Sequence, residues 1–280
     1  MRRSLLCLAA AWAAACGAPA SDVPHAPESA PLATAQQDSA AGAASAWPDA
    51  AGPFLALATS TAGEALLFRR DTTVAPAQPG VVGYDSVVTA ATIRDVRALP
   101  CAARAVLRLT DAPAGWSLAL DTAYAHPVMI DALEDLSPAD SQQLVVRIQR
   151  ALNTLPDTGG ELEFRGLPVV VRDAWVVHLK GQRLVVARAA RMRNLEAAAH
   201  EELRLVVLEN DQPRYVARVA GDEETVESWD LLATLMIRGQ PWLAVAREGT
   251  RSLQLELVAR DSAGWHSAWR SDALACGNPK

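Results

Sequence analysis

The side chains that could do chemistry in this 280-residue chain are scattered, and the densest group of them is acidic. Asp222, Glu223 and Glu224 are consecutive, and Glu227 follows after two intervening residues. A run of carboxylates is typical of a solvated loop, and it could also bind a cation or a basic partner. We therefore take these four residues as a weak candidate binding cluster.

Ser117 lies in a near-match to a nucleophile motif. The stretch Gly115–Ala119 is one residue away from G-x-S-x-G, which requires a buried strand before the serine and a helix after it. Here a turn-like stretch, Asp111–Ala114, precedes the motif and alternating apolar residues follow it. The pattern favours a turn that leads into a strand, so we do not predict a catalytic serine.

The histidines show no metal-binding spacing. They stand at positions 25, 126, 178, 200 and 266, without an H-x-H or H-E-x-x-H arrangement. His200 is followed by Glu201 and Glu202, but neighbouring residues of a strand point to opposite faces, so at most two of the three could share a ligand. The sequence therefore predicts no catalytic residue, no metal site and no cofactor.

Tryptophans are frequent in the last third of the chain. Trp265 and Trp269 are four residues apart, so on a regular strand, where side chains alternate between faces, they should share a face. Trp229 and Trp242 precede them in the sequence. An exposed row of tryptophans could bind a glycan or a partner protein. The alternative, which we favour, is that these rings pack between sheets.

Two cysteines suggest a disulfide. If Cys7 leaves with an export signal and Cys16 carries a lipid, only Cys101 and Cys276 remain, and an even pair in an exported protein indicates a bridge. In the chain-entropy model, a disulfide that closes so long a loop would raise the free energy of unfolding by about 4–5 kcal/mol. The alternative is a pair of buried free thiols.

The first sixteen residues have the pattern of an export signal. Arg2 and Arg3 precede an apolar run that is too short to span a bilayer and that ends in small residues. The run finishes at Cys16, which resembles the lipobox of bacterial lipoproteins, although Ala13 stands where that family usually has leucine. The resemblance implies that Cys16 is lipidated. Cleavage after Ala20 would instead give a secreted protein without a lipid.

The next segment, residues 17–52, is rich in proline, alanine and serine and poor in large apolar residues. This composition predicts a disordered tether that leads to a globular domain at residues 53–280. Loss of Arg2 and Arg3 with the signal changes the net charge from −6 to −8. An acidic domain repels phosphate backbones, so we do not expect a nucleic-acid partner.

Short strands bounded by turn residues fill the domain. Two groups of four predict antiparallel meanders, at 175–179, 184–189, 203–208 and 215–219, and at 231–237, 242–247, 253–259 and 265–270. Three more strands are expected at 92–96, 105–110 and 116–120. Units of about fifty residues with four strands suggest a mainly β, propeller-like fold, with a β-sandwich as the alternative. The last unit resembles FG-GAP-type repeats but lacks their calcium loop, because Arg238-Gly239-Gln240-Pro241 stands there.

One amphipathic helix is predicted near residues 138–155. Ser137 and Pro138 give a capping start, and Leu144, Ile148 and Leu152 follow at helical spacing.

We therefore expect a non-enzymatic lipoprotein of the bacterial cell envelope. Its lipid would insert into a membrane, most simply the outer membrane, because Gly17 in place of Asp after the cysteine resembles lipoproteins sent there. Its β domain would bind an envelope protein or a glycan. One alternative is an exported hydrolase or lyase whose site comes from distant residues.

Overall fold

Antiparallel strands make up most of the fold. The chain divides into Met1–Pro31 and Leu32–Lys280, and all elements described below belong to the second unit. The structure is a computed structural model, and it describes residues 33–34, 52, 55–58, 64–68, 79–83, 88–98, 105–156, 162–194, 199–222, 225–250 and 252–271.

The first meander sheet has four long central strands, with a short strand at each edge. Its order is β1-β14-β13-β12-β11-β10. Tight turns join the long strands: Asn210 and Asp211 between β13 and β14 both have positive φ, as a two-residue hairpin loop requires. The strands are β10 (Ile130–Ala132), β11 (Val170–Leu179), β12 (Gln182–Asn194), β13 (Ala199–Glu209), β14 (Gln212–Asp222) and β1 (Ala33–Thr34).

The second meander sheet repeats this plan, with order β18-β17-β16-β15-β9. Arg238 and Gly239, both at positive φ, form the loop between β15 and β16. The strands are β9 (Ala125–Val128), β15 (Ser228–Ile237), β16 (Gln240–Gly249), β17 (Ser252–Asp261) and β18 (Gly264–Arg270).

The third sheet curls into a nearly closed barrel. Its order is β5-β4-β8-β2-β3-β7-β6, so β5 and β6 are its two ends, yet Ala91 alone separates them in the chain. This connection brings the ends together, and β4 contacts β6. The strands are β2 (Leu55–Ala58), β3 (Glu64–Phe68), β4 (Pro79–Gly83), β5 (Val88–Ala90), β6 (Thr92–Ala98), β7 (Ala105–Thr110) and β8 (Trp116–Asp121).

The predicted helix is confirmed as α1 (Pro138–Asn153). Ser137 caps it by accepting a hydrogen bond from the Asp140 backbone N–H at 3.2 Å. Leu144 and Ile148 on its apolar side are buried with Val185 and Val206 of the first meander sheet. Two short 3-10 helices, η2 (Leu133–Asp135) and η3 (Leu162–Phe164), flank α1 in the sequence.

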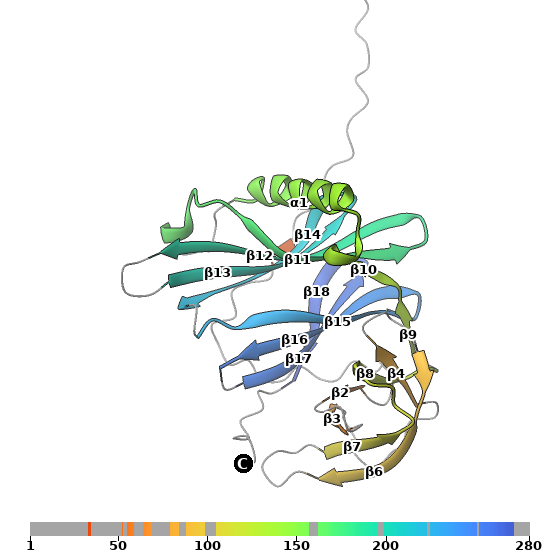
Figure 1. Ribbon diagram of the computed structural model, residues 1–280. Coiled ribbons are helices and arrows are strands. Elements are labelled where there is room, and N and C mark those ends of the chain that lie inside the picture. The colour runs from red at the N-terminus through yellow and green to blue at the C-terminus, as the bar shows by residue number, and fades with distance from the viewer. Residues whose placement is uncertain are drawn as a thin grey trace, which may run out of the picture. The chain divides into compact units, whose positions relative to one another are not determined.

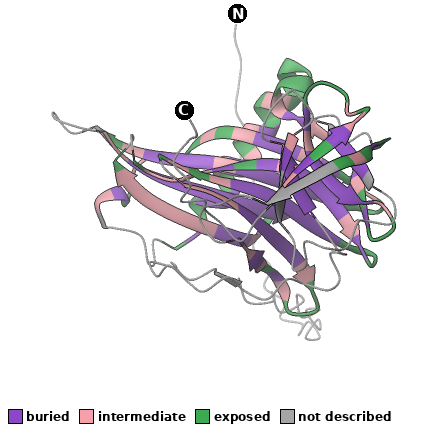
Figure 2. Ribbon diagram, turned by 90° about the horizontal axis from the view of Figure 1, so that it is seen from below, coloured by how far each residue is buried: buried purple, intermediate pink, exposed green. Residues whose placement is uncertain are grey.

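The described layers are held together by three apolar contacts. The helix covers one face of the first meander sheet. The opposite face, which includes Val186 and Val207, packs against Leu243 and Val245 of the second meander sheet. The far face of the second sheet, with Leu255 and Leu257, packs against barrel strands. Figure 1 shows this order of elements, and Figure 2 shows buried residues running along the long strands.

The mainly β fold with two four-stranded meanders is confirmed, and the eight predicted strands of the meanders are all present. The strands β12 and β13 are longer than predicted, because β12 runs to Asn194 and β13 starts at Ala199. The meanders stack face to face, as sandwich sheets or neighbouring blades would. The three strands predicted before the helix are confirmed as β6, β7 and β8, and they belong to the barrel-like sheet.

Two points in the predicted tether belong to the fold. Ala33 and Thr34 pair in parallel with Tyr215 and Val216 of β14. Gly52 is buried at φ +83°, and a Cβ there would lie 2.7 Å from Cγ of the Tyr124 ring, so only glycine fits. The rest of 17–52 lies outside the described residues.

Candidate functional site

The acidic candidates do not converge on a common centre among the described residues. Asp222 is exposed at the end of β14, and its Oδ1 lies 3.9 Å from Nε2 of His200. Glu227 accepts a hydrogen bond from Nε of Arg247 at 2.5 Å. Glu223 and Glu224 lie outside the described residues, so the cluster stays a prediction.

The three cysteines chosen from the sequence also lie outside the described residues. Lipidation of Cys16 and the Cys101–Cys276 bridge therefore stay predictions.

Ser117 is a strand residue, as its surroundings in the sequence predicted. It lies on β8, and its hydroxyl is within reach of two main-chain oxygens, of Val82 at 3.4 Å and of Leu232 at 3.3 Å. The hydroxyl thus links β8 to β4 and to β15. This geometry is that of a structural hydrogen bond.

The prediction that Trp265 and Trp269 share a face is wrong. A bulge in β18 pairs Trp269 with Leu257 and Ser267 with Val258, so one extra residue, Ala268, lies between. Trp265 consequently packs between the two meanders, and Trp269 packs on the barrel side. Both rings are buried, as are Trp229 and Trp242, and the four form no exposed row.

Charged side chains gather instead at one end of the first meander sheet, on both of its faces. On the face toward the second meander lies a group that we name the inter-sheet cluster. From the first sheet it contains Arg172, Asp173, Arg188 and Glu201, and from the second it contains Glu227, Arg247, Glu256 and Arg270.

Ion pairs account for the charges of the inter-sheet cluster. Arg172 bonds Glu201 at 2.9 Å. Arg188 donates to Asp173 Oδ2 at 2.7 Å and, across the layer, to the main-chain oxygen of Trp229 at 2.7 Å. This second bond ties the two sheets together directly.

The second meander contributes two more pairs. Besides bonding Glu227, Arg247 lies over the Trp229 ring, 5.8 Å from its centroid. Arg270 donates to Oε1 of the buried Glu256 at 3.2 Å. Nearby, partial desolvation raises the pKa of Asp230, with Asp173 adding to the shift and Arg188 opposing it.

The opposite face of the first sheet carries a group that we name the helix-face cluster: Arg191 of β12, Glu202 and Arg204 of β13, and Arg218 of β14. Strand register pairs Arg191 with Glu202 and Arg204 with Arg218. By alternation these side chains share the face of Val206 and Val216, which is the face that α1 covers.

Arg204 is at the centre of the helix-face cluster and is only 1% exposed. Its Nε and Nη2 both donate to Oε2 of Glu202, at 3.0 and 2.7 Å. Burial lowers the pKa of Arg204, Glu202 counteracts this, and Arg218 and Arg191 lower the pKa further. Among the described residues, no acceptor reaches its buried Nη1.

A second set of charges borders the helix-face cluster at η3. His200 Nδ1 lies 2.5 Å from Oε1 of Glu163, and its ring stacks on Phe164 with centroids 5.6 Å apart. Arg193 bonds the other Glu163 oxygen at 3.1 Å. His200 and Glu202 thus share a face while Glu201 points away, as strand alternation predicted for this triplet.

Sequence reasoning missed both clusters. The available signal was Glu202-Leu203-Arg204, in which opposite charges alternate with an apolar residue within one strand. Opposite charges two positions apart share a strand face, so they can pair there even when that face is buried.

In comparisons with known proteins, no family model, no curated protein and no solved structure matches the chain. Within the described ranges no helix is long and apolar enough to cross a membrane, and no group of three or more His, Cys, Asp or Glu side chains could hold a metal ion.

Proposed function

We propose that this chain is a non-enzymatic envelope lipoprotein whose stacked β domain binds a partner close to the membrane. The observation that carries the proposal is the order of features along the chain. A short apolar run ends in Cys16, a segment rich in proline and serine follows, and the chain then enters a large β fold.

The pairing of β1 supports a domain held near its anchor. Ala33 pairs with Tyr215 at the edge of the first meander sheet, so a connection of 16 residues, 17–32, separates Cys16 from the fold. Fully extended, this connection spans at most about 60 Å. A tether that joined the fold only at Gly52 would span about 130 Å.

The lipid anchor is tested in a bacterial host that exports the full chain. We expect incorporation of labelled palmitate, recovery with membranes, and loss of both in the Cys16→Ser variant. Mass spectrometry of the mature N-terminus provides the second readout. A mature chain that starts at Ser21 without lipid would contradict the anchor.

The non-enzymatic half of the proposal is tested with the exported Cys16→Ser chain. We expect no turnover in screens against esters, peptides and glycans. Reproducible turnover that is lost on substitution of His200, the histidine with the closest carboxylate contact, would replace this proposal with the exported hydrolase.

A further inference from the structure

We infer that His178 and Met129 form a surface binding site for a Cu(I) ion at one end of the first meander sheet, with Asp131 holding the histidine ring in position. The inference goes beyond the proposed function and does not rest on it. Palmitate labelling tests the anchor, and titration with the metal tests this site.

Strand register brings the three side chains together, although they are far apart in the chain. β10 and β11 pair antiparallel, with Asp131 opposite Val176. The main-chain N–H of His178 donates to the main-chain oxygen of Met129 at 3.0 Å, so the same register continues two residues further along β11. Met129 therefore lies directly opposite His178, and Asp131 lies on the diagonal. Residues in these positions have side chains on one sheet face and within reach of one another.

The ring of His178 has one nitrogen that is free to bind a metal. Its Nε2 lies 2.7 Å from Oδ2 of Asp131. An ionised carboxylate only accepts hydrogen bonds, so Nε2 carries the proton and, in the neutral ring, Nδ1 keeps its lone pair. Within the described residues, no hydrogen bond or ion pair reaches Nδ1. Histidine ligands of metals have this arrangement, in which a carboxylate bonds one ring nitrogen and the other nitrogen is open.

The thioether of Met129 decides which metal fits. Of the described large apolar side chains Met129 is the most exposed, at 59%, and its flexible side chain can place the sulfur near the opposite ring. Zinc takes imidazole, thiolate and carboxylate ligands, whereas thioether sulfur is a soft ligand that suits Cu(I). The described residues hold no group of three or more His, Cys, Asp or Glu that could bind a metal ion, so a site here requires the sulfur. An imidazole beside a thioether therefore favours Cu(I).

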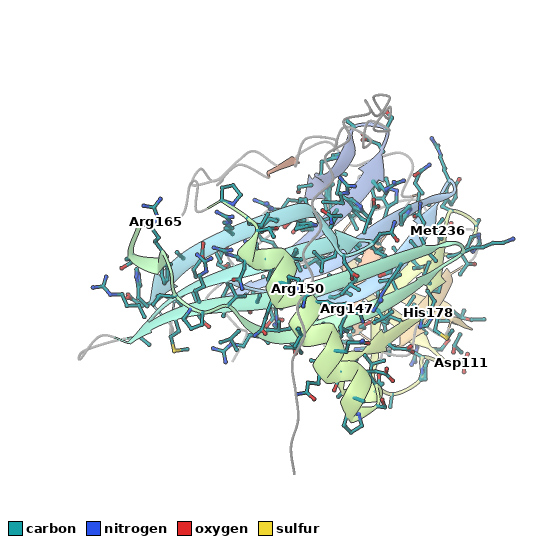
Figure 3. The ribbon with its side chains drawn as sticks, turned by 90° about the horizontal axis from the view of Figure 1, so that it is seen from above. Asp111, Arg147, Arg150, Arg165, His178 and Met236 are labelled. Atoms are coloured by element: carbon teal, nitrogen blue, oxygen red, sulfur yellow. The ribbon has the colours of Figure 1, made fainter. Side chains whose placement is uncertain are left out.

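The site is open to solvent and lies away from the charged clusters. The side chains of His178 and Asp131 are both exposed. Figure 3 shows His178 toward one end of the sheet and Arg165, which follows η3, toward the other. By register Arg183 lies opposite His178 on β12, and the negative charge of Asp131 offsets its positive charge. An exposed site of this kind suits an ion that exchanges with solvent.

The site is tested by anaerobic titration of the exported Cys16→Ser chain with Cu(I). Free thiols are first blocked with N-ethylmaleimide, so that Cys101 and Cys276 do not bind the metal. Competition with a weak chromogenic Cu(I) chelator measures the affinity. We expect one Cu(I) per chain and weaker binding of Zn(II). No uptake of Cu(I), or equally tight binding of Zn(II), would overturn the inference.

Substitutions in the site test each role. Loss of an outer-shell partner typically weakens a metal site about 10–100-fold, so we expect this effect from Asp131→Asn. Asp131→Glu keeps a carboxylate and should retain more affinity. Met129→Leu and His178→Gln each remove a ligand and should weaken binding at least as much as Asp131→Asn. An unchanged affinity in Met129→Leu would show that the thioether is not a ligand and would overturn the assignment to Cu(I).

His266 provides the matched control. It is also exposed and lies near a carboxylate, with Nδ1 at 3.7 Å from Oδ2 of Asp261, but Ala259 stands opposite it in place of a methionine. His266→Gln should leave Cu(I) binding unchanged. An equal loss in His266→Gln and His178→Gln would show unspecific binding to surface histidines and overturn the site.

NMR spectroscopy locates the metal, because Cu(I) is diamagnetic. The ring signals of His178 and the methyl signal of Met129 should shift as Cu(I) is added, while the methyl signal of Met192 should not. Shifts elsewhere without a shift at Met129 would contradict the inference.

Discussion

Glu201 and Glu202 are consecutive residues of one strand, yet they belong to two differently built charged regions. Glu201 belongs to the inter-sheet cluster and pairs with Arg172, whose side chain is 43% exposed. Glu202 belongs to the helix-face cluster and pairs with Arg204, whose side chain is 1% exposed. The inter-sheet cluster has as many carboxylates as arginines. The helix-face pair is much more deeply buried than the inter-sheet pair.

The contrast suggests different roles for the two faces. Balanced pairs such as Arg188–Asp173, together with the bond from Arg188 to the second meander, join layers of the fold. The Glu202–Arg204 pair of the helix-face cluster lies away from water, where a charge left without its partner costs about 3–5 kcal/mol.

The largest effect is expected from Glu202→Gln. Removing this carboxylate takes away the acceptor of Nε and Nη2 of the buried Arg204, and breaking a buried ion pair costs about 3–5 kcal/mol. Glu201→Gln, the matched control one residue away, should cost at most about 1 kcal/mol because its partner is exposed. Urea denaturation measures both. Equal costs would show that the two faces do not differ.

Arg204→Met should have the next largest effect, about 1–3 kcal/mol in the free energy of unfolding. The loss is smaller than for Glu202→Gln because Arg191 still lies opposite Glu202 and limits the cost of leaving that carboxylate buried. The double variant Glu202→Gln, Arg204→Met should be more stable than Glu202→Gln alone. Additive losses in this double-mutant cycle would mean that the two side chains do not interact.

Arg188→Gln should lower the free energy of unfolding by about 1 kcal/mol, because it removes a partly exposed ion pair and one hydrogen bond between the sheets. Hydrogen exchange should speed up at the start of β15, next to Trp229. Arg183→Gln, nearer the other end of β12, is the control and should change neither quantity. Unchanged exchange near Trp229 would show that Arg188 does not help to join the sheets.

Arg172→Gln should have the smallest effect in the comparison. It should lower the free energy of unfolding by at most about 1 kcal/mol, and by less in high salt. Thermal melts at low and high salt measure it. A loss above that of Arg204→Met would reverse the order of the two clusters.

Local patterns in the sequence were sufficient to predict the meanders and the helix. Turn residues such as Gly239 and Gly264 separate the strands, and Ser137 with Pro138 sets the start of α1. The prediction that Trp269 would share a face with Trp265 failed because of the bulge at Ala268. This bulge depends on pairing with the neighbouring strand, and the residues of β18 give no sign of it. The curling of the third sheet depends on which strands pair across long distances in the chain.

The charged clusters could not be predicted for the same reason. Arg191, Arg204 and Arg218 are separated by 13 and 14 residues, and only strand register brings them together. Glu202 with Arg204 was readable as a pair on one strand face. The burial of that face follows from α1 and η3, whose packing on the sheet is not apparent from the strand alone.

The most direct test of the account is the loss of unfolding free energy in Glu202→Gln and in Glu201→Gln, each measured by urea denaturation at low and at high salt. The account predicts that Glu202→Gln loses about 3–5 kcal/mol at both salt concentrations, because the partner of Glu202 is buried. It predicts that Glu201→Gln loses at most about 1 kcal/mol, and less in high salt, because the partner of Glu201 is exposed. Equal losses in the two variants would contradict the account.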